Sequence, residues 1–323
     1  MAAHQLLLFP EDATAPTLRD VADAVRTAGP EAGLPDAVPR ADHVRYQDVH
    51  VRSALSQTTG MRFRWTLNPY RGCTHGCEYC YARKYQRHLE LGAGDDFSTL
   101  IFVKRNLPDV LRRELSRASW TREGVAVGTA TDPYQPIEGH CRITRQCLEV
   151  LVAAHTPFSI VTKGPMVVRD VDVLAAASRQ GDCRVFLSVP SVDEEAWSRL
   201  EPGTAPPLQR LRAARALRDA GIDARVLMMP LVPGITTSKP QIERTVAAIA
   251  DADVPLAGVD VARLDPGVRE HFFAFLAREY PALVPGYLRL YQSARAKSAY
   301  IRAVTGIVHD LAGWAKARTK TPA

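Results

Sequence analysis

Three cysteines stand close together in the stretch 68–83, which reads NPYRGCTHGCEYCYAR. They are Cys73, Cys77 and Cys80, at a spacing of C-x3-C-x2-C. Thiolates this close can bind one metal centre from a single loop, and iron–sulfur clusters are held by such thiolates. A cluster of four irons takes four ligands, so three cysteines leave one iron open to a small chelating molecule, much as a catalytic zinc keeps one position open. The stretch therefore predicts a metal centre with a free coordination position.

Residue type also allows two other interpretations of these cysteines. Together with His75 or His88 they could bind a structural zinc ion. Zinc knuckles usually pair two short ligand couples across a spacer, however, and the chain has no second C-x2-C. A disulfide framework does not fit, because three is an odd number and no secretion signal is present. The cluster is favoured, and the alternative is a zinc-stapled nucleic-acid-binding module without catalysis.

The spacing C-x3-C-x-aromatic-C resembles the signature of the radical S-adenosylmethionine (radical SAM) superfamily. The wider string NPYRGCxHGCxYCYAR resembles the spore photoproduct lyase-like branch, also described as DNA repair photolyase-like. The resemblance implies that Cys73, Cys77 and Cys80 bind a 4Fe–4S cluster, and that S-adenosyl-L-methionine (SAM) chelates the open iron through its amine and carboxylate. It further implies an enzyme in which an external one-electron reductant of the flavodoxin or ferredoxin type drives cleavage of SAM. The resulting 5′-deoxyadenosyl radical would abstract a hydrogen atom from the substrate.

The bulk composition is that of a soluble globular protein, with 46% hydrophobic and 24% charged residues in 323. The start of the chain does not form a signal peptide, and no apolar run approaches the ~20 residues that span a bilayer. We therefore expect a cytoplasmic protein without a membrane partner. The formal net charge is +6, and basic residues concentrate in 286–323. Such a tail can attract nucleic acid, but more often it is the solvated face of a helix.

Apolar segments and helical patterns alternate through the middle of the chain, which predicts an α/β fold with a parallel sheet. The resemblance to radical SAM enzymes specifies this fold as a partial (β/α)6 TIM-type barrel with C-terminal helices. The expected strands are 62–67, 125–130, 158–162, 185–189, 224–229 and 259–262. The expected helices are 78–91, 107–117, 143–154, 167–178, 208–220, 242–250, 268–279, 287–298 and 299–318.

Three regions are expected along the chain. Residues 1–45 are rich in Ala, Pro, Asp and Arg and show weak periodicity, so they predict a mobile N-terminal extension. Residues 46–264 would form the partial barrel. Residues 265–323 would form a helical, basic C-terminal extension that covers an open edge or the bottom of the barrel.

Polar residues at the carboxyl ends of the strands are candidate contacts for SAM, because chemistry in α/β barrels takes place at that end. The carboxylate of Asp132 suits the SAM ammonium, or it forms an Asx turn before a proline. Lys163 offers a cation for the SAM carboxylate, and Ser188 offers a hydroxyl for the ribose. By resemblance, Tyr79 contacts the adenine. The full set of candidates is Tyr79, Thr129, Thr131, Asp132, Lys163 and Ser188.

The resemblance also suggests catalytic residues. Spore photoproduct lyases need a cysteine thiol that returns a hydrogen atom to the repaired thymine, and the matching position here is Thr129, whose O–H bond is too strong for that role. Tyr79 and Tyr81 match the paired tyrosines beside the third cysteine, so Tyr81 is a catalytic candidate. Cys141 is the second, provided that the loop 133–140 folds back toward the cluster. We expect a radical SAM enzyme that is not a true spore photoproduct lyase, acting on a nucleic-acid lesion or on a small molecule or peptide.

Overall fold

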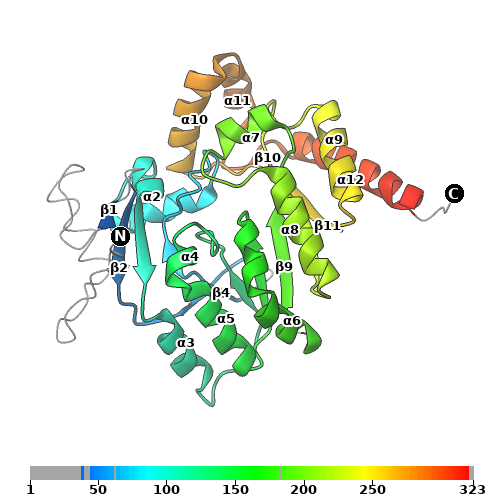
Figure 1. Cartoon of the computed structure of the whole chain (residues 1–323). Coiled ribbons are helices and arrows are strands. Elements are labelled where there is room, and N and C mark those ends of the chain that lie inside the picture. Colours follow the sequence, from blue (N-terminus) through cyan, green and yellow to red (C-terminus); the bar gives the residue numbers. More distant parts are fainter. Residues whose placement is uncertain (1–37, 40–43, 62, 182, 320–323) are drawn as a thin grey trace, which may run out of the picture.

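A seven-stranded sheet forms the centre of the molecule (Figure 1). The computed structural model describes residues 38–39, 44–61, 63–181 and 183–319. Within them the strand order is β11-β10-β9-β8-β7-β4-β3, and the six strands from β4 to β11 run parallel, whereas β3 pairs antiparallel with β4. This confirms the predicted α/β class and its six parallel strands. The bounds are β3 (Leu55–Gln57), β4 (Trp65–Leu67), β7 (Val125–Val127), β8 (Phe158–Thr162), β9 (Cys183–Ser188), β10 (Ala224–Leu231) and β11 (Leu256–Val261).

Helices connect the parallel strands. They bury an apolar stripe against the sheet, and α9 begins with a capping box formed by Ser238 and Gln241. On α8 the buried stripe includes Leu211, Ala214 and Leu217. The connecting helices are α5 (Ile143–Ala153) after β7, η2 (Pro165–Asp170) with α6 (Val171–Arg179) after β8, α7 (Glu194–Leu200) with α8 (Pro207–Asp219) after β9, and α9 (Lys239–Asp251) after β10.

A second, four-stranded sheet lies beside the first and was not predicted. Its order is β1-β2-β6-β5. No strand was expected for the sequence LIFVK, which forms the buried β6, or for the segment that forms β2. Most of the predicted N-terminal extension lies outside the described residues, but the part that forms β1 pairs with β2. The bounds are β1 (Val38–Pro39), β2 (Arg45–Val49), β5 (Tyr70–Arg71) and β6 (Leu100–Lys104).

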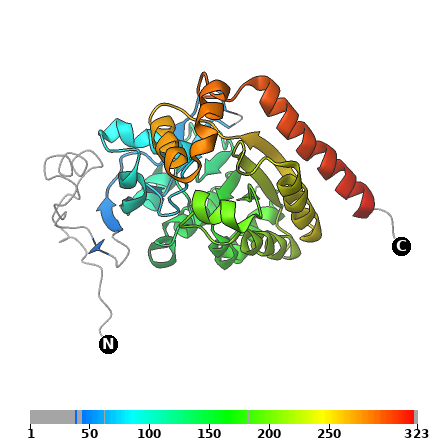
Figure 2. The ribbon, with the colours of Figure 1, turned by 90° about the horizontal axis from the view of Figure 1, so that it is seen from above.

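The C-terminal part is helical, as expected. It comprises α10 (Val268–Glu279), η3 (Pro281–Leu283), α11 (Val284–Leu290) and α12 (Ser298–Thr319). The predicted helix 287–298 starts and ends earlier than expected, because the chain turns after Leu290. The long α12 packs against α9 and the edge strand β11, at the side of the molecule opposite β1 and β2 (Figures 1 and 2). Among the described residues, no helix has both the length and the apolar character needed to cross a membrane.

Further short helices complete the fold, and one of them, α3 (Leu107–Leu115), packs against α5. The predicted helix 78–91 is a 3-10 helix, η1 (Tyr81–Leu89), which begins only after Cys80 because the preceding residues form tight turns. The others are α2 (Asp95–Thr99) and α4 (Glu138–Cys141).

Candidate functional site

The segment 72–80, called the cysteine loop below, connects β5 to η1. It is a series of tight turns, in which the Gly76 N–H donates to the Cys73 carbonyl (3.2 Å) and the Cys80 N–H to the Cys77 carbonyl (3.2 Å). Gly72 has φ +79°, and a Cβ there would lie 2.6 Å from the Leu100 carbonyl oxygen of β6. Glycine is therefore required at the entry of the loop, where the second sheet presses against it.

The three thiols of the loop lie in the interior. Cys73 and Cys77 are buried and Cys80 is half-buried. Burial raises the pKa of all three thiols, and for Cys73 the nearby Asp132 carboxylate raises it further. The thiols are therefore neutral without a metal, and coordination would remove their protons.

The loop fits an iron–sulfur cluster. In the described part of the chain, no three Cys, His, Asp or Glu side chains form a group that could hold a single metal ion. In a cluster each iron takes its own thiolate, so the three thiols need not converge on one point. The hydroxyl of Thr74, inside the loop, is buried and has no hydrogen-bond partner among the described residues. Such an orphaned group is a place where a bound group can complete the hydrogen bonding.

Arg83 of η1 holds the cysteine loop from one side. It is 2% exposed. Its guanidinium donates to the carbonyl oxygens of Gly76 (2.7 Å) and Cys77 (3.0 Å), and also to two carbonyls of the 90–94 loop. The guanidinium also lies over the ring of Phe97 in α2, 5.1 Å from its centroid. One side chain thus fixes the backbone between two of the thiols.

The turn 200–204, after α7, holds the cysteine loop from the other side. The Glu78 N–H donates to the Leu200 carbonyl (3.0 Å), and the Gly203 N–H donates to the His75 carbonyl (3.0 Å). A Cβ on Gly203 would lie 2.2 Å from the Thr74 carbonyl oxygen, so only glycine allows this approach. The sequence does not predict this turn, because nothing in its pattern links it to a segment more than a hundred residues earlier.

Three of the predicted SAM contacts are brought together. Lys163 Nζ, at the end of β8, donates to the Ser188 hydroxyl at the end of β9 (2.7 Å). The same ammonium lies 5.8 Å from the ring centroid of Tyr79, which belongs to the cysteine loop. Beneath them lie Glu201 and the fully buried Arg210, two charged residues that the sequence did not point to.

The other three predicted contacts bond to the cysteine loop and its flanks. Asp132 Oδ1 accepts a hydrogen bond from the Tyr134 N–H (2.9 Å), which is the Asx turn that sequence analysis left as the alternative. The Thr131 hydroxyl donates to the Gly72 carbonyl (2.6 Å), and the Thr129 hydroxyl lies 3.4 Å from Asn68 Nδ2. Contact between these side chains and SAM stays a prediction.

The carboxylate of Asp132 is enclosed by donors. It lies 3.3 Å from His75 Nδ1 and accepts from the Thr162 hydroxyl (2.6 Å) and the Lys163 N–H (2.7 Å). Burial alone would raise the pKa of this carboxyl, but His75 and these hydrogen bonds together lower it to about 2. Asp132 therefore ties the cysteine loop to the end of β8 as an ionised group.

The two catalytic candidates lie in different surroundings. Tyr81 is 40% exposed, and its hydroxyl donates to the Thr129 carbonyl, so it faces the loop after β7. Cys141 ends α4 and is buried. The charged groups that act on its thiol are Arg105, Asp48 and Glu138, none of which belongs to the cysteine loop. Their roles in catalysis stay predictions.

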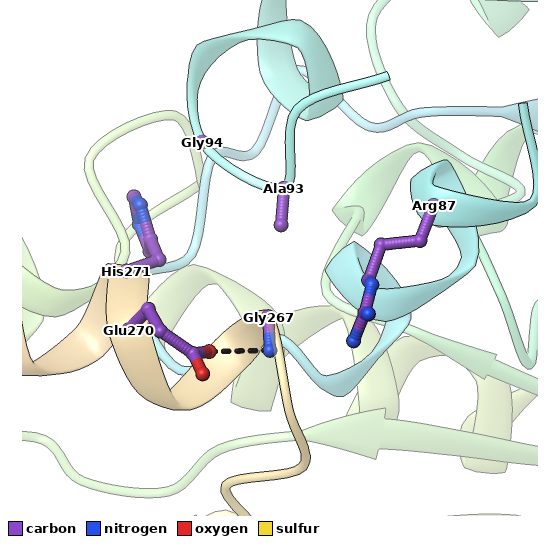
Figure 3. A pocket seen from close by; sticks show the side chains of 6 residues that line it. All are labelled: Arg87, Ala93, Gly94, Gly267, Glu270 and His271. Carbon is purple, nitrogen blue, oxygen red and sulfur yellow. Dashed lines mark hydrogen bonds between the residues drawn. The ribbon is translucent and has the colours of Figure 1, made fainter. Parts of the chain in front are cut away.

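A pocket of about 420 Å³ opens next to the cysteine loop, between η1 and the start of α10. Figure 3 shows Arg87 on one side of it and His271 on the other. His271 Nε2 lies 2.7 Å from the carboxylate of Glu78, a residue of the cysteine loop. The Glu78 side chain thus joins the cysteine loop to one wall of the pocket. It is lined by Arg87, Ala93, Gly94, Gly267, Glu270 and His271.

A loop of three cysteines at the carboxyl ends of an open parallel sheet defines a class of cofactor-dependent α/β proteins, and comparisons with known proteins place the chain within it. The family model of the radical SAM superfamily matches residues 67–270. The chain belongs to the radical SAM superfamily. It is 38% identical, over 79% of its own length and 76% of the relative's, to an uncharacterized protein of Mycobacterium tuberculosis strain H37Rv.

Two further similarities concern proteins whose names describe a function. The chain is 28% identical to the radical SAM Nalpha-GlyT isomerase of Pseudomonas phage M6, over 64% of this chain and 41% of that protein. Among solved structures, spore photoproduct lyase complexed with dinucleoside spore photoproduct superposes with a TM-score of 0.64 at 16% identity, over 90% of this chain and 84% of that one. These comparisons confirm the predicted resemblance to the radical SAM superfamily and to the fold of its spore photoproduct lyase-like branch.

Proposed function

We propose that the protein is a radical SAM enzyme that binds a 4Fe–4S cluster through Cys73, Cys77 and Cys80 and binds SAM beside it. The observation that carries the proposal is the packing of the cysteine loop. Three interior thiols lie in a backbone fixed from both sides, next to the Lys163–Ser188 pair at the strand ends. When bound, the cluster and SAM would supply a 5′-deoxyadenosyl radical for hydrogen abstraction from the substrate.

The residues of the chain would bind and orient SAM. Lys163 provides a positive charge for the SAM carboxylate, Ser188 provides a hydroxyl for the ribose, and the ring of Tyr79 provides a flat surface for the adenine. Arg83 and the turn 200–204 keep the loop in one conformation and limit the access of water to the thiols. An external one-electron reductant of the flavodoxin or ferredoxin type would be the redox partner.

We further propose a nucleic-acid-related substrate. Spore photoproduct lyase, a solved neighbour of the same fold, is complexed with a dinucleoside spore photoproduct, and the segment 286–323 is basic. A small molecule or peptide is the competing substrate class. The reaction is lyase-like or isomerase-like in this proposal, because those are the activities that the related proteins' names state.

Metal analysis of anaerobically reconstituted protein tests the cofactor. We expect about four irons with matching sulfide per chain, and loss of both in Cys73→Ala, Cys77→Ala and Cys80→Ala. Cys147→Ala is the matched control, because Cys147 is buried in the core on α5. One zinc in place of iron would support the zinc-stapled alternative and contradict the proposal.

SAM turnover tests the substrate class. The reconstituted protein is incubated under argon with SAM, a reductant and either damaged DNA, undamaged DNA or no addition, and 5′-deoxyadenosine is measured. Stimulation by damaged DNA alone supports a lesion substrate. Equal rates in all three reactions, with the cluster intact, favour the small-molecule or peptide class.

A further inference from the structure

Glu201 is a buried carboxylate at the bottom of the proposed SAM site. It follows directly after α7 and is 3% exposed. One carboxylate oxygen, Oε2, lies 2.6 Å from Arg210 Nη2. The other, Oε1, accepts the hydrogen bond of the Tyr79 hydroxyl and lies 3.7 Å from Lys163 Nζ. Burying a charge is costly unless it is paired and hydrogen-bonded, and Glu201 meets both conditions.

Arg210 anchors Glu201 to the sheet. The guanidinium of Arg210 is fully buried and also donates to the Ser188 carbonyl (3.0 Å), the Ala205 carbonyl (2.8 Å) and the Thr204 hydroxyl (2.5 Å). Every one of these partners belongs to the end of β9 or to the segment that follows α7. Because the Arg210 guanidinium is planar and its other acceptors are fixed in the fold, the Glu201 carboxylate that pairs with it has little freedom to move.

Lys163 is held less tightly than Arg210. Its ammonium is too far from Glu201 for a hydrogen bond and donates to Ser188 instead. In this group Arg210 and Lys163 carry positive charges and Glu201 carries the negative one. One positive charge therefore remains to be matched by an incoming anion such as a carboxylate.

We propose that Glu201 is a positioning residue of the SAM site. It fixes the Tyr79 ring through the Tyr79 hydroxyl and attracts the Lys163 ammonium, so both groups are in place before SAM binds. The inference rests on the proposed function. Groups that are already in position lose less conformational freedom when a ligand binds. The affinity for SAM therefore depends on Glu201, although both of its oxygens are already engaged within the protein.

The test is SAM binding to the reconstituted holoenzyme, measured under argon by equilibrium dialysis and by the electron paramagnetic resonance spectrum of the reduced cluster. Glu201→Gln keeps the shape of the side chain and removes its charge. We expect unchanged iron content, a dissociation constant for SAM raised about tenfold, and a SAM-induced spectral change that differs from the wild type. Glu195→Gln is the matched control, because Glu195 lies on α7, which directly precedes Glu201, and its side chain is 73% exposed.

Tyr79→Phe is a second test of the inference, for the case in which Glu201→Gln does not fold. This variant removes only the hydroxyl that bonds to Glu201 and leaves the Glu201–Arg210 pair intact. We expect it also to weaken SAM binding severalfold, and the double variant to lose less than the product of the two single effects. Wild-type affinity in Tyr79→Phe, or in a folded Glu201→Gln, overturns the inference. A wild-type protein that holds no iron, or holds iron but no SAM, overturns the proposed function and the inference with it.

Discussion

The guanidinium of Arg83 donates a hydrogen bond to the carbonyl oxygen of Cys77 at 3.0 Å. A residue that follows the third cysteine thereby holds the backbone of the second one. The same guanidinium reaches three other carbonyls, so it is a buried cation whose donors serve the cysteine loop and the loop before α2. Arginine suits this task because its planar fork has several donors and stays charged when buried.

Arg83→Met is expected to loosen the cysteine loop. Methionine fills the space but leaves four carbonyl oxygens without this donor, and we expect a loss of about 3 kcal/mol in the free energy of unfolding. The amount of iron retained after gel filtration should fall as well, since the loop backbone no longer fixes the positions of the thiols. Chemical denaturation of the metal-free protein measures the first effect. Arg87→Met is the control on the same helix, where the side chain is exposed, and a loss as large as that of Arg83→Met would contradict the prediction.

Gly203→Ala is expected to separate the turn 200–204 from the cysteine loop. The added Cβ would lie 2.2 Å from the Thr74 carbonyl oxygen, which is backbone and cannot rotate away. We predict a loss of about 2 kcal/mol or more in stability and a lower iron content after reconstitution. Gly286→Ala is the matched control, because a Cβ there meets open space. Iron content and melting temperature equal to the wild type in Gly203→Ala would show that the two segments do not need this contact.

Asp132 should contribute to the dependence of stability on pH. The pKa of this carboxyl is about 2 in the folded protein and about 3.9 when unfolded. Its folded pKa is the lower one, so its stabilisation is complete above the unfolded pKa and is lost as the pH falls through the folded pKa. Linkage gives about 2.5 kcal/mol for this difference. In Asp132→Asn, the fall in unfolding free energy between about pH 5 and pH 2 should therefore be shallower by about that amount.

Denaturation curves across this pH range measure the effect in the metal-free protein. Asp172→Asn serves as the control, because the Asp172 carboxyl also has a pKa lowered to about 2, mainly by hydrogen bonds from Arg145, but its side chain is 61% exposed. Solvent screens such a pair, and we expect little change. Acid limbs that coincide for wild type and Asp132→Asn would refute the assignment.

The protein is expected not to repair spore photoproduct cleanly. By the resemblance to these lyases, Thr129 stands where they need a thiol, and the charged groups that act on the Cys141 thiol, Arg105, Asp48 and Glu138, do not belong to the cysteine loop. The reaction supplies dinucleotide spore photoproduct with SAM and reductant under argon, and the products are separated by chromatography. Efficient conversion to thymines by the wild type would prove this prediction wrong, and its loss in Cys141→Ala would identify the donor.

The sequence by itself determined the class of the protein and its core. The spacing of Cys73, Cys77 and Cys80 is local, since one loop carries all three, and therefore it can be seen without a structure. The parallel strands were also predictable, because strands buried on both faces leave continuous apolar runs between amphipathic helices. Lys163 and Ser188 followed from the same rule, as residues at the carboxyl ends of neighbouring strands.

Only the tertiary structure decided what surrounds the thiols. Glu201 and Arg210 lie far from the motif in sequence, and their charges are ordinary for a surface until the fold buries and pairs them. The same holds for the turn 200–204 and for β6, whose short apolar run has no periodicity that separates a strand from a helix. Hydrogen bonds such as that from the Gly203 N–H to the His75 carbonyl join two segments far apart in the chain, and neither segment's sequence reveals the other as its partner. These long-range contacts exist only once the sheet has brought its strand ends together.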